Sequence, residues 1–114
     1  MTFDSVIPDM VFFTNERRAE IASGDRLNGA PDLVVEIISP GAENERRDRV
    51  LKRRVYGRFG VKEYWLVELV NRSVEVCRLG EEGLELAATF AGEDEMTSSV
   101  LPGFHMKLTD LFRL

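Results

Sequence analysis

The stretch PDLVVEIISP, residues 31 to 40, decides the fold, because its apolar, β-branched run between two prolines predicts a buried strand over residues 32–39. Side chains alternate between the two faces of a strand, so Glu36 shares its face with Asp32, Val34 and Ile38. Glu36 therefore lies among apolar neighbours rather than on a solvent-facing row. An unpaired carboxylate in such a place is costly, so Glu36 needs a partner.

The composition is that of one soluble globular domain. The chain has 114 residues, 44% hydrophobic and 31% charged, which suits a single domain spanning residues 1–114. No apolar run reaches the ~20 residues of a membrane span, and no signal-peptide pattern is present, so we expect a cytoplasmic protein with no membrane partner. One cysteine and one histidine argue against disulfide and zinc chemistry. A metal site would rest on carboxylates, which favour Mg²⁺ or Mn²⁺.

The rest of the sequence predicts a sheet with one long helix. Apolar residues at helical spacing, followed by two glycines, predict that helix over residues 43–60. Residues 6–13 predict a second buried strand, and the polar residues 14–30 a surface connection with at most a short helical turn. Three antiparallel strands are predicted next, over residues 62–69, 74–79 and 83–90. A short strand after Gly103 and a final helical turn near Thr109 complete the chain. This order predicts an α+β fold with a mixed β-sheet.

The predicted sheet brings two acids together. If strands 6–13 and 32–39 pair antiparallel, Asp9 lies beside Glu36. Two close carboxylates require a metal, a base or a shared proton. Lys52 lies beside the apolar stripe of the helix and is directed at the sheet. Two acids and a lysine suffice for metal-assisted hydrolysis of a phosphodiester.

The charge is unevenly distributed. The net charge of −5 argues against a protein that coats nucleic acid by bulk electrostatics. Nevertheless, the predicted helix carries seven of the fifteen basic residues: Arg46, Arg47, Arg49, Lys52, Arg53, Arg54 and Arg58. Such a helix presents either a solvated face or contacts for phosphates.

Several ordered motifs resemble those of a known family. These are IPDMVFF, PDLVVEIISP, a basic helix with Asp48, Lys52 and Tyr56 at four-residue spacing, GVKEYWLVE, and LPGFHMKLTDLF. Together they resemble the bacterial restriction endonuclease domain family sometimes called Uma-two, within the PD-(D/E)XK nuclease-like superfamily. The resemblance extends from about residue 6 to the end and implies a restriction-endonuclease-like fold.

The resemblance also implies site residues and an activity. Asp9 matches the acid of the first motif and Glu36 that of the second, so both would bind Mg²⁺ or Mn²⁺. Ile38 stands where the family's lysine normally lies, and Lys52 resembles the displaced lysine of some superfamily members. The implied function is a Mg²⁺-dependent DNA endonuclease with Asp9, Glu36 and Lys52 as catalytic residues.

One departure concerns the N-terminus. Relatives usually carry a helix and strands before the first motif, whereas here that motif begins at residue 8. We therefore expect an N-terminally shortened domain, or a partner that supplies the missing layer. An exposed apolar edge would favour a homodimer.

Structural alternatives remain open for these residues. Asp9 and Glu36 could be acids paired to helix arginines, and Lys52 could pair with Asp48. Asp32 reads as a turn or edge acid that could be an extra ligand. Tyr56 reads as an aromatic at the core edge, and Tyr64 and Trp65 as packing residues on opposite faces of their strand. Cys77 reads as a strand residue without a catalytic partner, and His105 as a structural residue of the short terminal strand rather than a general base. The alternative function is a catalytically inactive relic acting as a DNA-binding or protein-assembly module.

Overall fold

A five-stranded mixed sheet organises the chain. The computed structural model describes residues 9–24, 30–38 and 45–113. The sheet order is β1-β2-β3-β4-β5, and the first pair is antiparallel, the second parallel, and the last two antiparallel. Its strands are Met10–Phe12, Leu33–Ile38, Glu63–Glu68, Ser73–Gly80 and Gly83–Ala91. The predicted α+β fold with a mixed sheet is confirmed.

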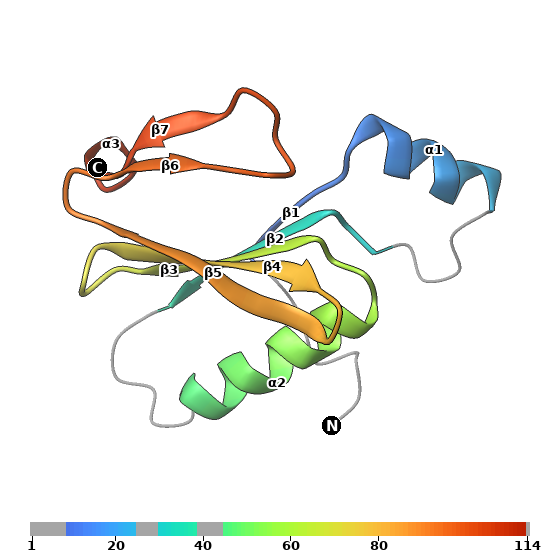
Figure 1. The fold of residues 1–114 in the computed structure, drawn as a ribbon, viewed down its shortest axis with the longest axis horizontal. Helices are drawn as coiled ribbons and strands as arrows, with labels where there is room; N and C mark the ends of the chain where they lie inside the picture. The colour runs from blue at the N-terminus through green and yellow to red at the C-terminus, as the bar shows by residue number, and fades with distance from the viewer. Residues whose placement is uncertain (1–8, 25–29, 39–44, 114) are drawn as a thin grey trace.

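Helix α2 (Glu45–Arg58) makes the crossover between the parallel strands β2 and β3 and covers one face of the sheet (Figure 1). The opposite face carries a two-stranded sheet of β6 (Glu95–Thr97) and β7 (His105–Lys107), followed by the short helix α3 (Leu108–Leu111). The strand after Gly103 and the final helical turn are confirmed, whereas β6 was not predicted. A three-residue strand offers too little alternation to be recognised from sequence.

The two faces bury separate cores. The helix-side core contains Ala30, Val34, Tyr56, Val61, Tyr64, Leu66, Cys77 and Leu84. The far-side core contains Leu33, Val35, Trp65, Val67, Val74, Val76, Met96, Val100 and Leu108. Tyr64 and Trp65 thus pack on opposite faces, as strand parity predicts.

The first strand is an edge strand, not a buried one. β1 pairs only with β2 among the described strands, and Met10 and Phe12 are 51% and 37% exposed. The prediction of a buried strand over residues 6–13 was wrong for residues 10–13, and residues 6–8 lie outside the described part. Apolar composition indicates a strand but does not say whether a neighbour covers it. The homodimer expected at such an edge stays a prediction.

A nine-residue helix, α1 (Asn15–Ser23), occupies part of the predicted surface connection. Thr14 caps its start by accepting a hydrogen bond from Arg17 N, and Gly24 closes its end at φ 84°. These capping residues were the sequence signals for the helix. The sequence analysis did not predict this helix, because most of its residues are exposed and it therefore lacks an apolar stripe at helical spacing.

Arg17 fastens α1 to the sheet through Asp32. Its Nη1 donates hydrogen bonds to the carbonyls of Ala30, Pro31 and Gly60, and its Nε lies 3.1 Å from Asp32 Oδ1. That last contact is an ion pair without a hydrogen bond. Burial alone would raise the pKa of Asp32, but hydrogen bonds from Thr14 and the charge of Arg17 hold it below its usual range. Asp32 is therefore a structural acid here.

Glu63 performs a similar role on the far side. This fully buried carboxylate accepts hydrogen bonds from Trp65 Nε1 at 2.6 Å, from Ser98 Oγ at 2.8 Å and from Ser99 Oγ at 2.6 Å. Burial alone would raise the pKa of Glu63, but these donors outweigh it and lower the pKa. Glu63 thus ties the segment that follows β6 to the central sheet.

In the described ranges no helix is long and apolar enough to cross a membrane.

Candidate active site at the end of β2

Glu36 lies near the carboxyl end of β2, on the face that α2 covers. Only 6% of the residue is exposed. Its Oε1 lies 2.8 Å from Lys52 Nζ, and its Oε2 accepts a hydrogen bond from the Tyr64 hydroxyl. Each carboxylate oxygen of Glu36 therefore has one hydrogen-bond donor. Lys52 and Tyr64 are thus the partners that the sequence analysis expected this buried carboxylate to need.

The local sequence explains how these groups meet. β2 and β3 pair with Val34 opposite Tyr64, so Tyr64 shares a face with Glu36 two positions along. Lys52 comes from the middle of α2, and the helix packs on that same face (Figure 1). The prediction that Lys52 is directed at the sheet is confirmed. Its alternative partner, Asp48, has a side chain outside the described part.

Asp9 joins the cluster from the neighbouring strand. β1 pairs antiparallel to β2 with Met10 opposite Val35, and this register leads to Asp9 beside Glu36. Asp9 Oδ2 accepts a hydrogen bond from the backbone nitrogen of Ile37 at 2.7 Å. The antiparallel pairing that the sequence analysis assumed is thus confirmed.

Tyr64 contacts Glu36, and Tyr56 contacts Tyr64. Tyr56 and Tyr64 make an edge contact with ring centroids 5.2 Å apart. Burial, followed by the hydrogen bond to Glu36, raises the pKa of Tyr64, and burial with the charges of Glu36 and Asp9 raises that of Tyr56. Both hydroxyls therefore stay protonated at neutral pH. Sequence reasoning treated both rings as packing residues and missed that Tyr64 holds Glu36.

The donor set suits a hard divalent cation but is small. No group of three or more His, Cys, Asp or Glu side chains in the described part of the chain could hold a metal. Asp9, the residue before β1, and Glu36 on β2 supply two carboxylates. Mg²⁺ is commonly bound by one or two carboxylates, with waters and substrate phosphates completing its shell. The residues present fit that group in type and number.

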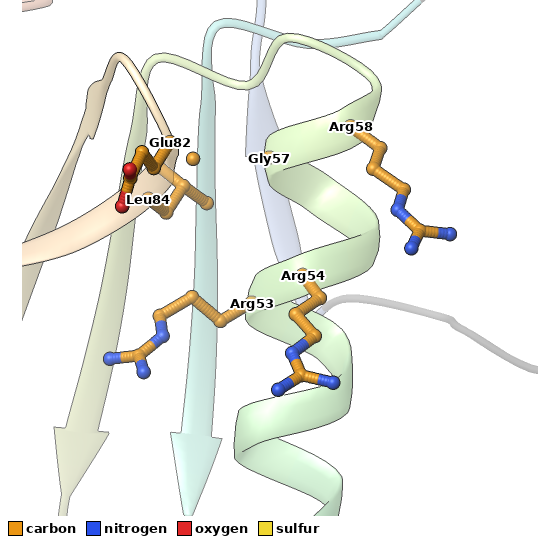
Figure 2. A pocket seen from close by; sticks show the side chains of 7 residues that line it. Arg53, Arg54, Gly57, Arg58, Glu82 and Leu84 are labelled. Carbon is orange, nitrogen blue, oxygen red and sulfur yellow. The ribbon is translucent and has the colours of Figure 1, made fainter.

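A hollow of about 560 Å³ lies between α2 and the turn joining β4 to β5. Figure 2 shows its arginines extending from the helix, with Glu82 on the turn and Leu84 at the start of β5. The helix comes close to the turn at Gly57, where a Cβ would lie 3.2 Å from Leu84 N. The lining residues are Arg53, Arg54, Gly57, Arg58, Glu82, Gly83 and Leu84.

The other candidate residues fall outside the cluster around Glu36. Cys77 is buried in the helix-side core, where burial raises the pKa of its thiol while Arg53 opposes that effect. His105 is exposed and lies 3.4 Å from Glu95. Neither shares a hydrogen bond or ion pair with Glu36 in the described structure, in agreement with their assignment as non-catalytic.

Comparisons with known proteins place the chain in the nuclease-fold class. The model of the Uma2 (Uma-two) family, described as "Putative restriction endonuclease", matches residues 2–109, and the chain belongs to this family. No curated protein matches the chain. A solved structure of "a putative nuclease belonging to DUF820" from Anabaena variabilis has a similar fold, with a TM-score of 0.64 and 22% identity. The match covers 94% of this chain and 59% of that one, so this chain spans about three fifths of its relative's length.

Proposed function

We propose that this chain is a Mg²⁺-dependent DNA endonuclease whose active site is built on Asp9, Glu36 and Lys52. The observation that carries the proposal is the 2.8 Å contact between Lys52 Nζ and Glu36 Oε1. Ile38 occupies the position on β2 where the family resemblance implies a lysine, and α2 delivers an ammonium group to the same carboxylate. The acid and the lysine are therefore together although the usual spacing is lost.

Asp9 and Glu36 would hold the metal ion. When bound, Mg²⁺ supplies a Lewis acid that polarises the phosphoryl oxygen and lowers the pKa of a water. Tyr64 fixes the orientation of Glu36 by donating to Oε2, so the carboxylate is preorganised. Lys52 is 25% exposed in its side chain, so its ammonium group can reach both Glu36 and a bound phosphate. There it would stabilise negative charge as the phosphodiester is attacked.

The basic side of α2 supports a nucleic acid as the substrate. Arg54 and Arg58 are exposed, and the described residues place no carboxylate within ion-pair distance of either. Both line the hollow beside the turn between β4 and β5. Guanidinium groups without protein partners suit phosphate oxygens. We expect them to contact the DNA backbone without reading its sequence.

The experiment is cleavage of plasmid and single-stranded DNA with Mg²⁺, Mn²⁺ or EDTA. The wild type should cut only with metal, and Glu36→Ala, Asp9→Asn and Lys52→Met should each lose most of the activity. Glu68→Gln is the matched control, because Glu68 is also an acid near the carboxyl end of a sheet strand, β3, but pairs with Arg49 rather than with Lys52.

The inactive relic is the competing function. Both oxygens of Glu36 already have protein donors, so a purely structural acid would need nothing more. If no metal supports cleavage by the wild type, or Glu36→Ala cuts as well as the wild type, this second function replaces the endonuclease.

A further inference from the structure

The hydroxyl of Tyr56 has no hydrogen-bond partner among the residues that the structure describes. Tyr56 is 7% exposed, and its oxygen is fully removed from solvent. A buried hydroxyl without a partner costs free energy, and native proteins retain few of them. Among the buried polar side-chain atoms of the described residues, the one other without a hydrogen bond is Asp32 Oδ1, which has the charge of Arg17 beside it. Tyr56 therefore requires a different explanation.

The position of Tyr56 points to the candidate active site. Tyr56 follows Lys52 by one helical turn, so both side chains lie on the same face of α2. Its ring touches that of Tyr64, whose own hydroxyl donates to Glu36. The charges of Glu36 and Asp9 both act on the Tyr56 hydroxyl. The unpartnered oxygen thus belongs to the cluster that surrounds the two acids.

The protonation state of Tyr56 limits what it can do. Burial and the two neighbouring carboxylates raise the pKa of its hydroxyl, so the group keeps its proton at neutral pH. It is therefore a hydrogen-bond donor and not a general base. Glu36 has both oxygens engaged by Lys52 and Tyr64. A phosphate oxygen of a substrate bound beside Glu36 would give the Tyr56 hydroxyl an acceptor.

We propose that Tyr56 donates a hydrogen bond to a phosphate oxygen of the substrate bound beside Glu36. Tyr64 and Tyr56 then have separate roles. Tyr64 serves the fold by fixing a carboxylate, and Tyr56 is reserved for the ligand. This inference rests on the proposed endonuclease function and adds a substrate-contacting residue to Asp9, Glu36 and Lys52.

The test compares Tyr56→Phe with Tyr64→Phe, two variants that each lose one hydroxyl from the same pair of rings. Thermal unfolding without ligand is the first measurement. The second is binding of a short fluorescent DNA duplex, followed by anisotropy with Ca²⁺ in place of Mg²⁺ to prevent cleavage. Tyr56→Phe should unfold no lower than the wild type, because no protein partner is lost. Tyr64→Phe should unfold at a lower temperature, because Glu36 Oε2 loses its donor.

For DNA, Tyr56→Phe should bind about tenfold more weakly than the wild type, the scale of one hydrogen bond to a charged oxygen. Equal affinity of Tyr56→Phe and wild type would overturn the inference while leaving the endonuclease function intact. A lower unfolding temperature for Tyr56→Phe without ligand would also overturn it, since the hydroxyl would then serve the fold. Failure of the wild type to bind DNA would instead overturn the proposed function, and the inference with it.

Discussion

Lys52 Nζ lies 2.8 Å from Glu36 Oε1, although the two residues are 16 positions apart and belong to different elements, α2 and β2. The carboxylate is nearly inaccessible, whereas the lysine side chain is one quarter exposed. The buried Glu36 carboxylate therefore needs the charge of Lys52, while the Lys52 side chain remains partly accessible to solvent. This asymmetry allows the same contact to stabilise the fold and to serve a bound phosphate.

The ion pair predicts strongly non-additive mutations. Lys52→Met keeps the aliphatic stem but leaves Glu36 without its cation, and should lower the free energy of unfolding by about 1–3 kcal/mol. Adding Glu36→Gln should restore part of that loss, because the uncompensated charge is removed. Urea denaturation of the two single variants and the double variant measures the coupling. Additive losses would show that the two side chains do not interact.

Stability should fall in acid because of Glu63. Its pKa in the folded protein is below the ordinary value of 4.5, so the unfolded chain binds a proton more readily. The stabilisation is complete above pH 4.5 and is lost as the pH falls through the lowered pKa of the folded state. The pKa of Asp32 is also lowered, so Asp32 adds a further loss of stability as the pH falls below its ordinary pKa of 3.8.

The measurement is the free energy of unfolding of Glu63→Gln across this acid range. The variant should be less stable at neutral pH, and its stability should depend less on pH than that of the wild type. Glu82→Gln, a change on the exposed turn, is the control and should follow the wild type. An unchanged acid dependence in Glu63→Gln would show that other groups cause it.

The exposed arginines of α2 predict a salt-dependent signature. The double variant Arg54→Gln with Arg58→Gln should weaken DNA binding for every sequence tested and reduce the slope of log K against log salt by about two. Arg113→Gln is the matched control, because Arg113 is also exposed but pairs with Asp110 at the C-terminal helix. If both variants change the slope equally, the α2 arginines make no specific phosphate contacts.

Strong periodic patterns made much of the fold predictable. The strands at β2, β3, β4 and β5 and the long helix α2 appear close to their predicted bounds. Strand alternation also placed Glu36, Tyr64 and Trp65 on the correct faces. These features were predictable because side chains alternate between the two faces of a strand and recur every 3.6 residues along a helix, and both patterns are visible in the local sequence.

What sequence reasoning missed depends on tertiary neighbours. Apolar residues of β1 looked buried, but burial requires a covering layer that composition does not reveal. Helix α1 is held by Arg17, whose partners Ala30, Pro31 and Gly60 are distant in sequence. Tyr64 could have been recognised as a partner of Glu36 only once the parallel register of β2 and β3 was known.

The most direct test of the central claim is calorimetric titration of Mn²⁺ into the wild type, Glu36→Gln and Glu68→Gln. A metal centre at Asp9 and Glu36 predicts that the wild type and Glu68→Gln bind Mn²⁺ equally well and that Glu36→Gln loses binding. Absence of binding in the wild type, or equal binding by Glu36→Gln, would contradict the account and leave Glu36 as a structural acid held by Lys52 and Tyr64.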